Sequence, residues 1–425
     1  DNKGDVEQIA QYAIPYIDLV IVDLYPYEEY VAAGASHQDI IEKIDIGGIS
    51  LIRDAAKNYK DVVIVPSKEC YFKLLSLLRE QDGCTTEQDR LSFAKYAFAT
   101  SSHYDTAIFK YLNGDGEVSA FAENILTASP LRYGENPHQE ALYFGEDTSL
   151  PIQLHGKEIY YNNLLDIEAA IELISDFDDP TVAIIKHNNA CGCAVRDDIF
   201  TAWTDALACD PVSSFGGIVI ANRPIDEKTA VEINKIFFEV IIAPQYSEKA
   251  LEILKEKKNR IILLRGDTVP SQKKFRSLLS GVLVQDRDTF VETESSLTVV
   301  TDKQPRKDQI ADLLFANKLV KHSKSNAIVL AKNRTLLASG IGQTSRVDSL
   351  KQAIEKARSF GFDLNDAVMA SDAFFPFPDC VQIADEAGIT AVIHPGGSIR
   401  DGESIDYCNA HGMAMVKTGI RHFKH

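Results

Sequence analysis

Along the first part of the chain, short apolar runs alternate with segments whose apolar residues recur at helical spacing. The runs are rich in Val and Ile and are closely followed by proline, which is typical of buried strands that lead into a turn. Because strands alternate with helices, the pattern predicts an α/β layer with parallel strands. The predicted strands cover residues 17–24 and 61–65, and the predicted helices cover residues 49–56 (after a break at Gly47-Gly48), 71–79 and 87–99.

A weak seam separates this part from the rest of the chain. Turn-forming residues fill positions 113–116, and Ala128-Ser129-Pro130 breaks the pattern again. We therefore place the domain boundary near Asn124, so that residues 1–124 and 125–425 form separate domains.

The second part repeats the alternation of strands and helices. Asp166 is expected to cap a helix whose apolar positions include Ile167 and Ile174. Two stretches, 184–217 and 327–375, share the order strand, polar turn, helix, strand and a turn of small and aromatic residues. This shared order predicts a duplicated α/β unit. The predicted strands cover residues 181–185, 218–221, 327–330, 367–370 and 391–393.

Composition excludes several classes of protein. The chain has 425 residues, of which 45% are hydrophobic and 25% charged, as in ordinary globular proteins of two or three domains. No apolar run is long enough to span a membrane, and no signal-peptide pattern is present. Seven cysteines without a regular framework are typical of a reducing compartment, so we expect a cytoplasmic protein with no membrane partner.

The net charge bears on the kind of ligand. A formal charge of −18 argues against binding to nucleic acid. An anionic small substrate remains compatible with this charge, provided that Arg and Lys side chains gather around it.

Searches for familiar catalytic motifs fail. The chain has no phosphate-binding loop, no HExxH zinc motif and no nucleophile elbow. The glycines at 340–342 lack the third glycine of a dinucleotide-binding motif. The sequence His-Gln-Glu at 138–140 resembles half of a zinc deaminase motif, but the paired cysteines do not follow. The spacing of Cys191 and Cys193 is wrong for zinc, so we interpret them as small buried thiols.

Five polar segments follow apolar strands, where ligands bind in open α/β sheets. The richest contains Lys186 and His187, directly after the predicted strand 181–185. A neutral His can remove a proton from a weakly basic amine, and a neighbouring Lys can stabilise a developing oxyanion. Taken alone, the dipeptide is more often a solvated Lys and a hydrogen-bonded structural His. The five segments are residues 131–139, 186–192, 340–348, 371–377 and 421–425.

Other candidates are weaker when they are considered one at a time. Arg132 and Arg421 are suited to binding a phosphate or carboxylate, but a single Arg is usually a surface residue. The aromatic turn with Phe374 and Phe375 either stacks on a flat heterocycle or packs in the core.

The first part of the chain offers Tyr25, Asp45 and Lys57 as candidates. Asp45 precedes Ile46-Gly47-Gly48, whose amides can cradle a phosphate at the start of a helix. Lys57 comes twelve residues later, near the end of that helix. The alternative for each residue is ordinary surface charge.

The number and order of these segments resemble one family over essentially the whole chain: the bifunctional enzyme of purine biosynthesis that is AICAR transformylase and IMP cyclohydrolase. The resemblance implies that 10-formyltetrahydrofolate donates a formyl group to the 5-amino group of AICAR, and that the product then closes to IMP. The matching stretches are 18–26, 44–48, 55–58, 131–134, 136–139, 186–187, 213–217, 325–326, 342–343, 345–346, 371–377 and 421–425.

The resemblance also implies the architecture. Residues 1–124 would form a methylglyoxal-synthase-like α/β domain with the cyclohydrolase activity, and we expect its front segment, which binds the nucleotide phosphate in the family, to be missing before Asp1. Residues 125–425 would form a duplicated cytidine-deaminase-like α/β transformylase domain with two α/β subunits. A homodimer is expected, with transformylase sites at the subunit interface. The folate is a cosubstrate, no catalytic metal is expected, and binding of a monovalent cation is left open.

The resemblance assigns roles to individual residues. In the transformylase part, His187 would be the general base, Lys186 its electrostatic partner, and Asn326 the residue that orients the reacting groups. In the cyclohydrolase part, Tyr25, Asp45 and Lys57 would be catalytic. The implied substrate-binding residues are Arg132, Tyr133, Gly216, Glu239 (where some members have Asp), Gln343, Arg346, Phe374, Phe375, Arg421 and His425.

Three alternatives remain at this point. The chain retains only the transformylase activity if the missing front segment abolishes ring closure. A non-catalytic nucleotide-binding module would bind AICAR without transferring a formyl group. A zinc deaminase would contain bound zinc.

Overall fold

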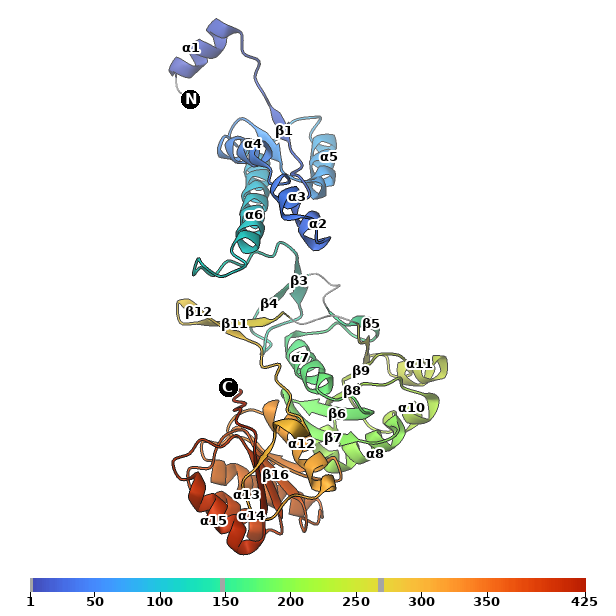
Figure 1. Ribbon diagram of the computed structural model, residues 1–425. Helices are drawn as coiled ribbons and strands as arrows, with labels where there is room; N and C mark the ends of the chain where they lie inside the picture. Colours follow the sequence, from blue (N-terminus) through green and yellow to red (C-terminus); the bar gives the residue numbers. More distant parts are fainter. Residues whose placement is uncertain (1–2, 146–149, 267–270) are drawn as a thin grey trace. The chain divides into compact units, whose positions relative to one another are not determined.

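The computed structural model describes residues 3–145, 150–266 and 271–425, and its internal contacts divide the chain into two units, Asp1–Ser129 and Pro130–His425 (Figure 1). The division falls a few residues after the predicted boundary at Asn124. Residues 1–2 of the predicted first domain lie outside the described residues. The assignment of one activity to each unit stays a prediction.

The first unit is an α/β layer around two short parallel strands. The strands pair Leu19 with Val63 and Ile21 with Val65, and Ile52, Ile64 and Phe93 fill the core beside them. Its elements are α1 (Lys3–Tyr12), β1 (Leu19–Ile21), α2 (Tyr27–Ala32), α3 (His37–Ile41), α4 (Ile46–Lys57), β2 (Val63–Val65), η1 (Lys68–Cys70), α5 (Tyr71–Glu80) and α6 (Glu87–Leu112).

Two predicted helix boundaries in this unit are wrong. Helix α4 begins at Ile46, so the two glycines lie in its first turn, where the Asp45 carboxylate accepts a hydrogen bond from the Gly48 amide at 2.6 Å. Helix α6 continues to Leu112, well past the predicted end, because its second half buries Tyr104 in a cluster with Tyr27. Tertiary packing thus explains why α6 is longer than predicted, and the Asp45 cap explains why α4 begins earlier than predicted.

The second unit is built on a twelve-stranded sheet with the order β13-β18-β17-β16-β14-β15-β7-β6-β8-β9-β10-β5. Its strands are β5 (Ile152–His155), β6 (Thr181–Lys186), β7 (Asn189–Val195), β8 (Ile218–Ala221), β9 (Val240–Ala243), β10 (Ile261–Leu264), β13 (Thr298–Val299), β14 (Ile328–Lys332), β15 (Thr335–Gly340), β16 (Val368–Ser371), β17 (Ala391–His394) and β18 (Ala414–Lys417). Its helices are α7 (Tyr161–Ser175), α8 (Ile199–Cys209), α9 (Pro211–Ser214), α10 (Glu227–Ile233), α11 (Glu248–Lys255), α12 (Lys307–Lys321), α13 (Arg346–Ser359), α14 (Asp379–Glu386) and α15 (Asp401–His411), and η3 covers Glu294–Ser296.

The two halves of this sheet repeat one order of elements. In each half a helix (α7 or α12) leads into a hairpin (β6–β7 or β14–β15), and a helix (α8 or α13) then leads into three parallel strands. The halves meet where β7 and β15 run antiparallel, with Ala194 opposite Thr335. The two hairpins lie next to each other and point in opposite directions. Their turns therefore lie at opposite ends of the central strands.

Helices cover both faces of the sheet. Because successive strand residues point to opposite faces, Ala183 and Ile185 pack with α7 and α12, whereas Val182 and Ile184 pack with α8, α10 and α11. Helices α13, α14 and α15 pack on that second face in the other half. Glycine is required where a helix approaches closely, since a Cβ on Gly340 would lie 1.8 Å from a carbonyl of α13.

Two smaller sheets lie outside the large one. The hairpin of β11 (Lys273–Leu278) and β12 (Gly281–Asp286) stands apart from the twelve strands (Figure 1), and ion pairs from Lys274 and Arg287 to Glu172 join it to α7. Strands β3 (Ala128–Leu131) and β4 (Ala141–Phe144) form the other.

The structure confirms a mixed α/β architecture and corrects one helix start. Helix α7 begins at Tyr161, so Asp166 lies inside it and does not cap it. The likeness to methylglyoxal synthase and to cytidine deaminase stays a prediction. Among the described residues, no helix combines the length and the apolar character that crossing a membrane requires.

Candidate functional site

A two-residue turn between β6 and β7 presents Lys186 and His187. His187 and Asn188 have φ angles of 51° and 64°, the left-handed conformation that such a tight hairpin turn requires at both positions. The His187 side chain is exposed and Lys186 is half-buried. The turn therefore rotates the chain directly after the strand, which allows two adjacent side chains to serve one ligand.

The ammonium group of Lys186 is held against a second loop. Its Nζ donates to the Phe215 carbonyl at 2.8 Å. In the same loop Gly216 has a φ of 75° and its amide donates to the Phe237 carbonyl at 2.9 Å. The Phe215 ring is mostly exposed and contacts the Phe237 ring. Lys186 and Gly216, both predicted, are thus brought together.

Glu239 forms the centre of a neighbouring polar group. Its carboxylate accepts hydrogen bonds from the Tyr160 hydroxyl at 3.1 Å and from the side-chain amide of Asn163 at 3.2 Å. It also pairs with the Lys157 ammonium at 3.6 Å. Burial and the charge of Glu239 raise the pKa of Tyr160 to about 12, so its hydroxyl stays a donor at neutral pH.

Two further predicted residues lie beside this group. The Tyr133 ring is 5.5 Å from the Tyr160 ring, and the guanidinium of Arg132 lies over Tyr133 at 5.4 Å from its centre. The Arg132 side chain is exposed, so it remains available to an anion.

Asp166, which sequence reasoning assigned to a helix cap, contacts the turn. Its Oδ1 accepts a hydrogen bond from the backbone amide of Asn188 at 2.6 Å. Burial raises the pKa of Asp166, and this rise is opposed by the Asn188 amide and the charge of His187. The only sequence signal for this contact was an acidic residue on a helix whose neighbouring positions are apolar.

Asn326 precedes β14, and its side chain is fully engaged with the protein. Its Nδ2 donates to the carbonyls of Gln343 (3.0 Å) and Thr344 (3.3 Å), and its Oδ1 accepts from Arg346 at 3.1 Å. Gln343 contributes to this arrangement through its backbone. Its half-buried side chain donates to the Ile341 carbonyl.

Arg346 was predicted to bind substrate, but its environment argues against this role. It is 9% exposed and its guanidinium donates to Asn326, to Ser371 at 2.8 Å and to Asp372 at 2.7 Å. A buried guanidinium that is already paired holds protein segments together rather than binding a ligand.

One side chain joins the turn to the segment that contains Asn326. Asn189 donates through Nδ2 to the His187 carbonyl at 2.7 Å, and its Oδ1 accepts from the Lys324 amide at 3.0 Å. Because β6 and β14 belong to different halves of the sheet, the candidate site spans both halves.

The C-terminal tail lies along the same segment. The Ser325 amide donates to the Lys424 carbonyl at 2.9 Å, and the Lys424 amide donates to the Ser325 hydroxyl at 3.1 Å. Arg421 and His425, both exposed, flank the Phe423 ring at 4.4 and 5.3 Å from its centre. The C-terminal segment, which was predicted to bind substrate, therefore lies next to the residue that precedes Asn326.

The aromatic turn after β16 is divided between surface and core. Phe375 is completely buried, where it packs against the His394 ring at 4.8 Å. Phe374 is partly exposed. Phe374 is therefore the more accessible of the two rings, and the prediction that this turn lines a pocket stays a prediction.

In the first unit the structure brings two of three predicted residues together. The Tyr25 amide donates to Asp45 at 3.4 Å, and the Asp45 amide donates to the Tyr104 hydroxyl at 2.7 Å. Lys57 lies at the other end of α4, about 18 Å away at 1.5 Å per residue. The Gly48 amide is taken by Asp45, so the predicted phosphate cradle is already occupied in part.

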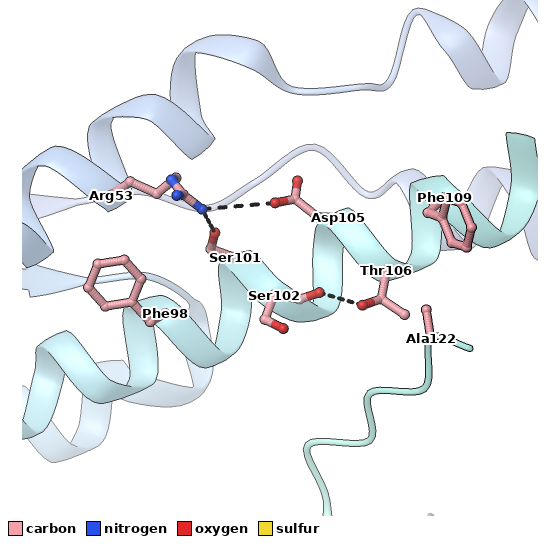
Figure 2. A pocket seen from close by; sticks show the side chains of 8 residues that line it. All are labelled: Arg53, Phe98, Ser101, Ser102, Asp105, Thr106, Phe109 and Ala122. Carbon is pink, nitrogen blue, oxygen red and sulfur yellow. Dashed lines mark hydrogen bonds and ion pairs between the residues drawn. The ribbon is translucent and has the colours of Figure 1, made fainter. Parts of the chain in front are cut away.

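A separate cavity of about 530 Å³ opens on α6 of the first unit (Figure 2). Arg53 of α4 donates to Ser101 at 3.1 Å and lies 4.0 Å from Asp105 at its edge. None of the predicted residues lines this cavity. Within residues 3–145, 150–266 and 271–425, no three His, Cys, Asp or Glu side chains gather in a way that would hold a metal ion.

Comparison with known proteins gives matches over the whole chain. A family model described as the AICARFT/IMPCHase bienzyme matches residues 55–356. The chain is 64% identical over 425 residues to the bifunctional purine biosynthesis protein PurH of Bacteroides thetaiotaomicron, covering 100% of this chain and 84% of that one. It is 46% identical over 442 residues to PurH of Ruminiclostridium cellulolyticum, covering 100% and 85%. A crystal structure of ForH overlaps 27% of this chain and 60% of its own at 30% identity, with a TM-score of 0.22.

Proposed function

The chain belongs to the AICARFT/IMPCHase bienzyme family and is a bifunctional AICAR formyltransferase and IMP cyclohydrolase, and from this premise we propose that formyl transfer takes place at the β6–β7 turn. The observation that carries the proposal is the left-handed turn that exposes His187 beside Lys186, tied through Asn189 to the segment of Asn326. The two hydrogen bonds of Asn189 thus connect the turn of His187, the candidate base, to residues from the other half of the sheet.

The proposed chemistry follows from the side chains. The aromatic 5-amino group of AICAR is a poor nucleophile, because its lone pair delocalises into the ring. His187 removes a proton from this group as it attacks the formyl carbon of 10-formyltetrahydrofolate. Lys186 uses one of its three hydrogens on the Phe215 carbonyl and directs the others toward the oxyanion. As the tetrahedral intermediate collapses, the bond between the formyl carbon and the folate nitrogen breaks, that nitrogen takes the proton held by His187, and tetrahydrofolate leaves.

Asn326 has a different part in this proposal from Lys186. Both hydrogens of its amide are taken by the Gln343 and Thr344 carbonyls. We therefore assign Asn326 the task of fixing the shape of the site, and we assign the oxyanion to Lys186.

The remaining predicted residues would bind the two substrates. Exposed Arg132 and Arg421 suit the phosphate of AICAR, and Phe374 offers a ring face to a flat heterocycle. The Glu239 carboxylate, held by Tyr160 and Asn163, suits the N–H groups of a pterin-like ring.

Ring closure is proposed for the first unit, at Tyr25 and Asp45. Their support is the hydrogen bond between the Tyr25 amide and Asp45 and the exposure of the Tyr25 ring. Lys57 is omitted from this arrangement because α4 separates it from Asp45.

A cytoplasmic homodimer is also proposed. The β11–β12 hairpin exposes apolar side chains at its tip, including Leu279, Val282 and Leu283, which supports contact with a second copy. All seven cysteines are free, which agrees with a reducing compartment.

The test replaces His187 by Asn, which tolerates the left-handed backbone of the turn. We expect His187→Asn to release tetrahydrofolate about 10²- to 10⁴-fold more slowly, the range typical of a lost general base. Calorimetric AICAR binding and conversion of formyl-AICAR to IMP should persist. Near-normal formyl transfer in this variant would remove His187 from the mechanism.

The chain offers a matched control. Asn333 occupies the corresponding position of the β14–β15 turn, with a φ of 54°. Asn333→His should leave formyl transfer unchanged.

A further inference from the structure

We propose that Asp166 is a positioning residue for formyl transfer, which fixes the backbone of the His187-Asn188 turn and places a negative charge beside the imidazole. The inference rests on the proposed role of His187.

The contact between Asp166 and the turn is direct. Helix α7 packs on the sheet through Ile167 and Ala170, which brings the neighbouring Asp166 to the end of β6. Its carboxylate accepts the Asn188 amide at 2.6 Å, a short bond typical of a charged acceptor. Without this acceptor the amide of a left-handed residue would lose its partner.

The second half of the sheet uses the same device. Asp312 lies five residues after the start of α12, as Asp166 lies five residues after the start of α7. Asp312 accepts the amides of Asn333 (2.8 Å) and Arg334 (2.5 Å) in the β14–β15 turn. Holding the turn is therefore common to both carboxylates, and only Asp166 does so beside a titratable ring.

That ring gives Asp166 a second task. When the imidazole accepts the proton of the amine it becomes positively charged, and a carboxylate beside it stabilises that charge. Charged groups near the turn include Lys186 on β6, Lys324, whose backbone amide donates to Asn189, and Glu239, which is paired with Lys157. The Asp166 carboxylate offsets the unfavourable effect of the neighbouring Lys186 ammonium on the positive ring.

The experiment compares Asp166→Asn with Asp312→Asn in the full chain. Asn keeps the size of the side chain and an oxygen that can accept the turn amide, but it removes the charge. For Asp166→Asn we expect kcat for formyl transfer to fall about ten- to hundredfold, as when a carboxylate behind a functional histidine is lost, with the KM for AICAR within about threefold. Calorimetric binding of AICAR should stay unchanged, which separates this loss of kcat from a general structural defect.

Two further variants make the result decisive. Asp166→Glu, which keeps the charge, should recover most of the kcat that Asp166→Asn loses. Asp312→Asn should leave kcat within about twofold, whatever it does to thermal stability. Wild-type kcat in Asp166→Asn, or an equal loss of kcat in Asp312→Asn, would overturn the inference. An active His187→Asn enzyme would instead overturn the proposed function.

Discussion

The two hairpin turns of the large sheet share a backbone and differ in what surrounds it. In each turn a Lys ends the first strand, two left-handed residues follow, and an aspartate from the preceding helix accepts an amide. The first turn carries His187 and Asn188 where the second carries Asn333 and Arg334. The fold therefore builds the same scaffold twice.

The second turn is closed by two arginine side chains, one from the turn itself and one that follows β7. Arg196 donates to the Asn333 carbonyl at 2.8 Å, and Arg334 pairs with Asp179 at 2.9 Å. Asp179 lies two residues before β6, as Asn326 lies two residues before β14. At the first turn no guanidinium of a described residue contacts the backbone of residues 187–188, and the imidazole stays exposed. The first turn can therefore act as a site, because the imidazole of His187 remains accessible to a ligand.

The largest expected effect comes from exchanging the two turn residues. The double variant His187→Asn/Asn333→His has the same composition as the wild type, but its imidazole lies at the closed turn. We expect formyl transfer to remain about 10²- to 10⁴-fold below wild type, since a base works only within reach of its proton. Spectroscopic detection of tetrahydrofolate measures this rate. Recovery of activity in the double variant would mean that the surroundings of the first turn are unimportant.

The next effect is on stability and depends on pH. His422, whose amide donates to the Asp372 carbonyl, lies with its ring between Asp288 (2.5 Å) and Glu292 (2.8 Å). Burial lowers the pKa of His422, but the bonds and charges of the two carboxylates outweigh burial and raise the pKa from 6.5 to about 9. Because the folded-state pKa is raised, the stabilisation is complete below pH 6.5 and is lost as the pH rises through about 9.

The loss should be on the order of 3 kcal/mol in the free energy of unfolding, measured with urea at about pH 6 and about pH 9.5. In His422→Gln this part of the pH dependence should vanish. The closed turn carries Asn333 and Arg334 and no histidine, so it should not contribute to this pH dependence. An unchanged pH dependence in the variant would show that His422 does not anchor the tail.

The smallest effect is expected at the closed turn itself. Arg334→Asn introduces the residue that stands at the corresponding position of the first turn, and it removes the pair with Asp179. The two side chains are 37% and 66% exposed, so the pair should contribute only about 0.2–1 kcal/mol to unfolding. Thermal unfolding and turnover would measure this. A large loss of formyl transfer would show that the closed turn takes part in the reaction.

Much of the fold could be predicted from apolar patterns. The strands that became β6, β8 and β17 were located to within a residue or so, because fully buried strands read as continuous apolar runs. Helix ends were less accurate. The start of α4 depends on a bond from Asp45 to Gly48, and the end of α6 depends on packing around Tyr104.

The candidate site was predictable as a set of residues but not as an arrangement. Lys186 contacts the loop of Gly216, and Asn189 connects the His187 turn to the segment before Asn326, while the roles of these residues stay predictions. The availability of each side chain was not predictable. The Arg346 guanidinium is paired with Asp372, and Phe375 is buried in the core, although both residues lie in segments that resemble a binding site.

The order of motifs along the chain determined the family, the two activities and the residues worth considering, because these follow from which side chains are present and in what sequence. Only the tertiary structure decided which polar groups are satisfied by the protein and which remain for a ligand. The deciding contacts, such as Asp166 with Asn188 and Asn189 with Lys324, join residues that are distant in sequence. A hydrogen bond acts over about 3 Å, so its partners are fixed only once the chain has folded.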